Sequence, residues 1–107
     1  MAKKPKRDRT VRREDARSTK KAIEERLALA KIEPGGAPDR AIVVSTAALV
    51  EPSARAIPCP VCGSSVRAMS HTAEVREGRR VRVVAVDCSR CGARVERFFD
   101  VTAPLLS

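Results

Sequence analysis

The chain of 107 residues contains no Trp and no Tyr, and its aromatic residues are the two adjacent phenylalanines Phe98 and Phe99. Small domains ordinarily fill their cores with aromatic and branched aliphatic side chains, so the core of this chain must be thin and a covalent or metal cross-link is expected. Long hydrophobic segments are also missing, because no apolar run exceeds four residues. This absence excludes a membrane-spanning helix.

The N-terminus is basic but has no apolar stretch of the kind that secretory signals contain. We therefore expect a cytoplasmic protein in a reducing compartment, where cysteines bind metals more often than they form disulfides. Positive charge is in excess, with 22 Lys and Arg against 13 Asp and Glu, a net charge of +9. Every lysine lies within residues 1–33, and the rest of the chain uses arginine only. This shift in composition predicts a boundary near residue 34.

Composition divides the chain into six segments. We predict a disordered basic arm over 1–9, a basic helix over 10–33, a linker over 34–40, an extended segment over 41–56, a cysteine-containing domain over 57–101 and a tail over 102–107. The helix contains no Gly or Pro, carries a narrow apolar stripe of Ile23, Leu27 and Ala30, and ends before the sequence Pro-Gly-Gly at 34–36. Within 41–56, a short helix at 46–50 is the competing prediction.

Two five-residue strings, Cys59-Pro-Val-Cys62-Gly and Cys88-Ser-Arg-Cys91-Gly, are separated by a hairpin-like segment. Two cysteines three positions apart on a tight turn can direct both sulfurs at one ion, and the glycine that follows permits the left-handed backbone of such a turn. Two turns of this kind predict a closed tetrahedral site of four sulfurs. A structural zinc ion is the favoured occupant; iron, free thiols and redox-active pairs are the alternatives.

A hairpin pattern lies between the two cysteine pairs, with Glu77-Gly78 as its turn, and a third strand follows, in which Val95, Arg97, Phe99 and Val101 alternate with Glu96, Phe98 and Asp100. From Ile57 to Val101, these features resemble the zinc-ribbon family, and the two CxxCG turns carry the resemblance. The resemblance implies one structural Zn²⁺ held by Cys59, Cys62, Cys88 and Cys91, together with binding of nucleic acid or protein. The predicted fold is a small α+β protein: a zinc ribbon with a three-stranded antiparallel sheet, preceded by a basic, partly disordered N-terminal helix.

Enzymatic activity is not expected. Four cysteines complete a tetrahedral site, whereas catalytic zinc sites keep an open position. His71 is the single histidine. If Glu77-Gly78 is a two-residue turn, His71 faces Val84 across the hairpin and shares a sheet face with Met69 and Val86, which favours a packing role over a functional one. No small-molecule substrate and no membrane partner are predicted.

Basic side chains gather at two places and make nucleic acid the first candidate partner, with phosphate contacts instead of base stacking because aromatic residues are scarce. The candidates are Lys3, Lys4, Lys6, Arg7, Arg9, Arg12, Arg13, Arg17, Lys20 and Lys21 near the N-terminus, and Arg79, Arg80 and Arg82 at the hairpin. Such residues are also common as solvated surface. One alternative is a protein-interaction adaptor that uses Phe98, Val50 and the hairpin tip; a more distant one is a rubredoxin-like electron carrier.

Overall fold

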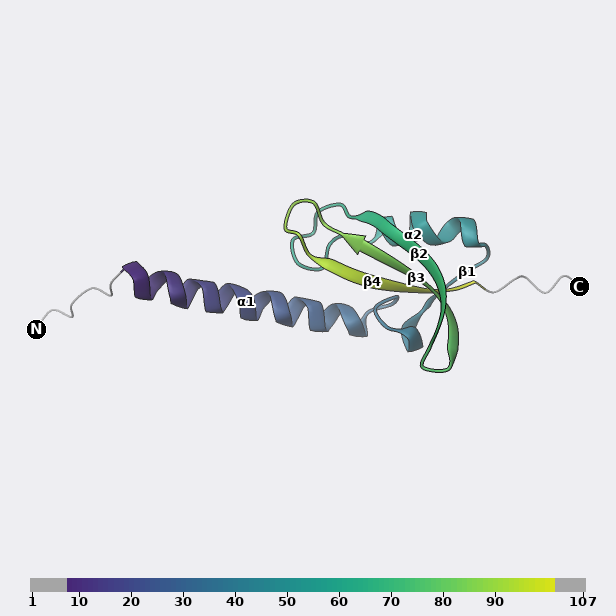
Figure 1. Ribbon diagram of the computed structural model, residues 1–107, viewed down its shortest axis with the longest axis horizontal. Helices are drawn as coiled ribbons and strands as arrows, with labels where there is room; N and C mark the ends of the chain where they lie inside the picture. Colours follow the sequence, from purple (N-terminus) through teal and green to yellow (C-terminus); the bar gives the residue numbers. More distant parts are fainter. Residues whose placement is uncertain (1–7, 102–107) are drawn as a thin grey trace, which may run out of the picture.

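A computed structural model describes residues 8–101, with the backbone alone for residues 8–15. Its main element is a four-stranded sheet, and Figure 1 shows how the helices are arranged around it. The elements in chain order are α1 (Asp8–Ile32), the 3₁₀ turn η1 (Pro38–Arg40), β1 (Ile42–Val44), the 3₁₀ turn η2 (Ala47–Leu49), α2 (Val50–Ala56), β2 (Arg67–Arg76), β3 (Arg79–Asp87) and β4 (Arg94–Val101). The protein is a small α+β fold. The predicted arm falls largely, and the predicted tail wholly, outside the described residues.

The sheet has the strand order β1-β4-β3-β2. Strands β2, β3 and β4 form an antiparallel meander, and β1 adds to β4 in parallel, with Ile42 opposite Phe99 and Val44 opposite Val101. The prediction of a three-stranded sheet is therefore wrong, because β1 adds a fourth strand to the antiparallel three. The apolar run 41–44 is extended as its β-branched residues favour, and the edge of β4 supplies the backbone partners that a strand of three residues needs.

The β2–β3 hairpin turns at Glu77 and Gly78, which have φ values of 51° and 74°. Two successive positive φ values are typical of a type I′ turn, whose twist matches that of the flanking strands. The turn sets the predicted register, with His71 opposite Val84. A bulge between Ala68 and Ser70 shifts the register beyond that point, so Met69 is exposed instead of lying beside His71 on the packed face.

The segment 41–56 is extended only at Ile42–Val44, because residues 50–56 form α2. The competing prediction of a short helix at 46–50 agrees better with the structure, since η2 is a 3₁₀ helix over Ala47–Leu49 and α2 begins at Val50. Pro52 lies in the first turn of α2. A proline is tolerated there because the N–H groups of the first turn have no partner within the helix.

Each face of the sheet carries its own apolar cluster. Phe99, Val84 and Val86 are buried against Val50 and Ala54 of α2 on one face. Phe98 lies on the other face, in a smaller cluster with Val81, Val83 and the partly buried Ala41. Because Val50 is 0% and Phe98 6% exposed, neither can form the contact surface predicted for a protein-interaction adaptor.

Helix α1 is continuous over its 25 residues and extends beyond the rest of the fold (Figure 1). Between residues 16 and 32, only Ile23, Leu27 and Ala30 are partly buried, as the apolar stripe predicts. Arg26 donates a hydrogen bond to the carbonyl of Val61 and so joins α1 to the first cysteine turn. None of the described helices is long and apolar enough to cross a membrane.

Candidate metal centre

Each pair of cysteines lies on a turn with the same backbone hydrogen bonds. In the first turn, the N–H of Gly63 donates to the carbonyl of Cys59 at 2.9 Å and the N–H of Cys59 donates to the carbonyl of Ser64 at 2.9 Å. The second turn repeats both bonds, from Gly92 to Cys88 at 2.8 Å and from Cys88 to Ala93 at 2.9 Å. The two turns are therefore equivalent units that present their sulfurs to a common point.

The glycine after each pair has the conformation predicted for it. Gly63 has a φ of 74° and Gly92 a φ of 77°, values that residues with a Cβ rarely adopt. A Cβ added at either position would meet no atom within 4 Å. The need for glycine at both turns is therefore conformational and not a matter of space.

The four sulfurs form one cluster. The Sγ atoms of Cys59, Cys62, Cys88 and Cys91 all lie within 4.8 Å of one another, with 3.5 Å between Cys59 and Cys91 and 3.4 Å between Cys62 and Cys88. A tetrahedral ion bound at about 2.3 Å from each sulfur requires sulfur–sulfur distances of about 3.8 Å. The cluster is therefore positioned to bind a metal ion, and all four cysteines predicted as ligands contribute to it.

One cysteine of each pair faces the core and the other faces solvent. Cys59 and Cys88 are buried with Val66 and Phe99 in the main apolar cluster, whereas Cys62 and Cys91 are exposed. An ion held by all four would join the two turns to each other and to the core. Such an ion would cross-link, at this point, the thin core expected from the composition.

Electrostatic interactions among the four cysteines favour the binding of a cation. Hydrogen bonds from the side chain and backbone of Ser64 lower the pKa of Cys62 to about 6. At Cys91, the backbone N–H of Ala93 lowers the pKa, but burial and the other three sulfurs outweigh it and raise the pKa to about 12. Thiolates this close repel one another, so a full set of four is stable only with a positive charge among them.

Comparisons with protein-family models, with curated proteins and with solved structures found no match for this chain. The geometry of the site is therefore the basis for assigning a function.

The candidate nucleic-acid residues whose side chains the structure describes lie on two separate elements, α1 and the β2–β3 hairpin. Arg17, Lys20 and Lys21 lie on α1 and are exposed. Arg79 and Arg80 are exposed at the hairpin, and Arg82 is partly buried, at the end of β3 remote from Cys88. The remaining candidates, Lys3, Lys4, Lys6, Arg7, Arg9, Arg12 and Arg13, have side chains outside the described part of the chain.

Arg97, which is 5% exposed, was not predicted from the sequence to have a role at the site. Its guanidinium donates to the carbonyls of Ala54, Ile57 and Pro58, directly before Cys59. The alternation of residues along β4 could have indicated this role. Arg97 occupies the same face as Phe99, and a cation on the apolar face of a strand indicates a buried polar contact.

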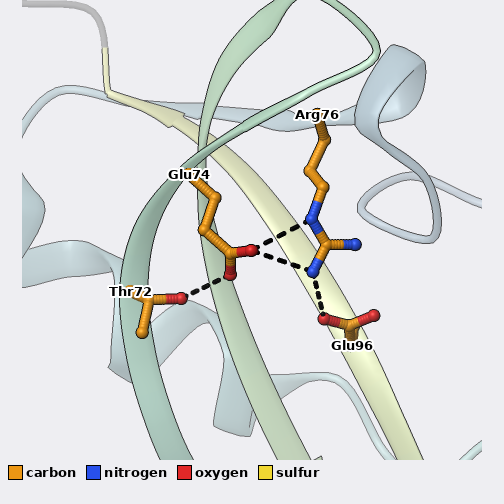
Figure 2. Close-up of polar contacts among 4 residues, drawn as sticks. All are labelled: Thr72, Glu74, Arg76 and Glu96. Atoms are coloured by element: carbon orange, nitrogen blue, oxygen red, sulfur yellow. Dashed lines mark hydrogen bonds and ion pairs between the residues drawn. The ribbon is translucent and has the colours of Figure 1, made fainter.

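A second feature that was not predicted is the polar network on the outer face of the hairpin, which Figure 2 shows. Thr72 donates to Glu74 at 2.6 Å, and Arg76 bonds both Glu74 and Glu96 at 3.0 Å. The guanidinium of Arg76 also lies 5.9 Å from the ring centroid of Phe98. Arg76, which the sequence places near the basic hairpin tip, is thus neutralised within the protein.

Proposed function

We propose that this chain is a non-enzymatic module, organised by one structural Zn²⁺, that binds the phosphate backbone of nucleic acid. The cluster of four cysteine sulfurs supports the metal part of the proposal. Four thiolate ligands favour Zn²⁺ and leave a tetrahedral ion no open position for a substrate or a reactive water. The role of the ion is then to hold the two cysteine turns together.

The observation that carries the nucleic-acid part is the exposure of the basic side chains on α1. Arg17, Lys20 and Lys21 are exposed, and within the described part of the chain none of them has an ion-pair partner. The N-terminal part of the helix extends beyond the globular part of the protein (Figure 1), where a long polyanion can reach it from several sides. Basic residues in such a position bind phosphates and release counterions.

The hairpin provides a second set of cations. Because Arg76 is bonded to two carboxylates, the set reduces to Arg79, Arg80 and Arg82, for which the structure shows no ion pair among the described residues. With the two phenylalanines buried, there is no aromatic platform for bases. The proposal is therefore backbone recognition with little dependence on base sequence.

The metal is tested on the purified chain by elemental analysis and by replacement with Co²⁺. We expect one zinc per chain, no visible absorption in the native protein, and intense thiolate-to-cobalt bands after replacement. An iron–thiolate spectrum in the native protein would instead support the rubredoxin-like electron carrier. Absence of bound metal would overturn the proposal.

Nucleic-acid binding is tested by fluorescence anisotropy with labelled duplex DNA and single-stranded RNA at 50 and 200 mM salt, using the zinc-loaded chain. The variant K20Q/K21Q should bind more weakly and lower the log–log salt slope by about 0.9 for each phosphate that is no longer neutralised. The matched control is R40Q/R55Q, which removes the same charge from exposed residues of the globular part. Equal effects of the two variants would show that net charge alone matters, and absence of binding would remove this part of the proposal.

A further inference from the structure

The edge of β4 that faces away from β3 is paired over only part of its length. Strand β1 covers Phe99–Val101, and the N–H of Phe98 donates to the carbonyl of Gly35 at 2.8 Å. Successive residues of a strand point their backbone groups to alternate sides, so the N–H and C=O of Glu96 point to the same side as those of Phe98. Among the described residues, no group bonds to Glu96 there. The first half of β4 thus presents an open edge.

A groove of about 790 Å³ runs along this open edge. Its walls are the C-terminal half of α1 on one side and the residues around the first cysteine turn on the other. The lining includes Leu27, Ala30, Ile57, Pro58, Pro60 and Phe98. A helix beside an unpaired strand, with apolar side chains between them, is a geometry that accepts an additional strand.

The charges around the groove favour an acidic occupant. Besides Arg97 and the cluster cysteine Cys59, four ionisable residues line it: Lys31, Glu33, Arg94 and Glu96. Glu96 is bonded to Arg76 at 3.0 Å, and the charge of Glu33 acts on the buried Arg97. Lys31 and Arg94 are exposed, and neither has an ion-pair partner in the part of the chain that the structure describes. Arg94 also acts on the carboxylate of Asp87, which is already paired with Arg67. Lys31 and Arg94 therefore remain as cations without an ion-pair partner of their own among the described residues.

We propose that this groove, defined by α1, the edge of β4 at residues 94–97 and the segment 57–60, binds an extended acidic peptide segment of a partner protein. The peptide adds to the sheet at β4, in line with β1. Its backbone bonds Glu96, alternate apolar side chains pack against Leu27 and Ala30, and acidic side chains face Lys31 and Arg94. This site is separate from the exposed basic residues of α1 at Arg17, Lys20 and Lys21.

The open edge distinguishes a peptide from other acidic ligands. Nucleic acid carries negative charge but lacks the amide groups that alternate as donor and acceptor along a strand. A free carboxylate could approach Lys31 or Arg94 but would not fill a groove of this volume. The combination of an edge, an apolar wall and two cations fits an extended polypeptide.

The test uses isothermal titration and amide NMR shifts of the zinc-loaded chain with three capped hexapeptides. One alternates Glu and Val, one alternates Lys and Val, and one is the Glu–Val peptide with every amide nitrogen methylated. We expect the Glu–Val peptide to shift the Glu96 amide and to bind at least about tenfold more tightly than either of the others. Failure of the Glu–Val peptide to bind at millimolar concentration, or equal binding of all three, would overturn the proposal.

Variants of α1 test whether the peptide binds in this groove. A30F places a ring in the groove and should weaken binding about tenfold, whereas A28F makes the same change at an exposed position of the same helix and should leave binding unchanged. K31E should shift the preference towards the Lys–Val peptide and keeps the test available if A30F does not fold. Its matched control is K20E, also exposed on α1 but outside the groove. Equal binding by A30F and A28F, or no shift of preference in K31E, would contradict the proposed site.

Discussion

The Nη2 atom of Arg97 lies 2.9 Å from the carbonyl oxygen of Pro58, the residue that precedes the first cysteine of the four-sulfur cluster. The Nη1 atom of the same guanidinium donates to Ala54 at 3.1 Å and to Ile57 at 2.6 Å. The last carbonyls of a helix have no partners within it, so Arg97 satisfies the C-terminal end of α2 and fixes the chain that enters the first turn. Burial lowers the pKa of Arg97, while the charge of Cys59 opposes that shift and favours the guanidinium ion.

Replacing Arg97 with Met should destabilise the zinc-loaded protein by about 3 kcal/mol, because one buried and two partly buried carbonyls lose their charged donor at once. The same change should weaken zinc retention, since the first cysteine turn is no longer attached to β4. Urea unfolding measures the first effect and competition with a chromophoric chelator measures the second.

Two other variants separate the hydrogen bonds of Arg97 from its charge. R97K keeps the charge but lacks the planar fork, and it should recover only part of the stability. R94M changes an exposed arginine of the same strand and should have little effect. If R97M were as stable as R94M, the three hydrogen bonds would have no net role in holding the turn.

Substitutions at the two residues of the hairpin turn should change the stability of the protein in opposite directions. Glu77 has a φ of 51°, which is unfavourable for a residue with a Cβ, so E77G should stabilise the protein by about 0.5–1 kcal/mol. Gly78 has a φ of 74° and open space around it, so G78A should destabilise it by about 1 kcal/mol for conformational reasons alone. Thermal unfolding should show shifts of about 4–8 °C per kcal/mol. A stabilising G78A would contradict the type I′ assignment.

Local rules were sufficient to predict the cysteine turns and the hairpin register from the sequence. Spacing and the glycines placed Cys59, Cys62, Cys88 and Cys91 in one cluster, and the turn at Glu77-Gly78 placed His71 opposite Val84. Both predictions concern segments of a few residues whose backbone conformation follows from the residues themselves. The alternation in β4 was also correct in placing Phe98 and Phe99 on opposite faces.

Tertiary contacts determine the features of the fold that local sequence patterns did not predict. The run 41–44 is a strand because the edge of β4 was available to it, and residues 50–56 form a helix because Val50 and Ala54 are buried on the sheet. The bulge at Ala68 and Ser70 has no turn signal in the sequence, and it displaced Met69 from the predicted face. The hydrogen bonds of Arg97 join residues about 40 positions apart, beyond the reach of any local pattern.

The two phenylalanines should differ in their contribution to stability. Phe99 is fully buried between the sheet and α2, whereas Phe98 belongs to a cluster of three buried residues on the opposite face. F99A should cost about 3–5 kcal/mol, enough to unfold a protein of this size under many conditions. F98A should cost less because the apolar cluster around Phe98 is smaller. Paired urea titrations of the two variants, with F99L and F98L as milder changes, test this order, and equal losses of stability would contradict it.

If the chain binds nucleic acid as proposed, the arginines of the hairpin should contribute unequally to the affinity. Arg76 is occupied by Glu74 and Glu96, so R76Q should leave both the affinity and its salt dependence nearly unchanged. R80Q removes an exposed charge and should lower the log–log salt slope by about 0.9 if Arg80 binds a phosphate. Anisotropy titrations at several salt concentrations compare the two variants. A larger loss of affinity in R76Q than in R80Q would show that the Arg76 network opens on binding.

Removal of the metal should unfold the domain and not merely loosen the cysteine turns. Cys59 and Cys88 are part of the same buried cluster as Val84, Val86 and Phe99, and four thiolates brought together without a cation repel one another. Structural zinc sites supply about 10–16 kcal/mol of apparent binding free energy, which exceeds the stability expected for a domain with so few large apolar residues. Chelation should therefore abolish slow amide exchange throughout β3.

Two variants separate loss of the metal from damage to the core. C88S removes a buried ligand and should behave like the chelated protein at any zinc concentration. C91S removes an exposed ligand, so the core keeps its packing, and excess zinc should restore part of the protection of β3. Slow exchange that persisted in the chelated wild-type chain would mean that the apolar clusters alone hold the sheet, and the metal would then be a ligand of a preformed fold.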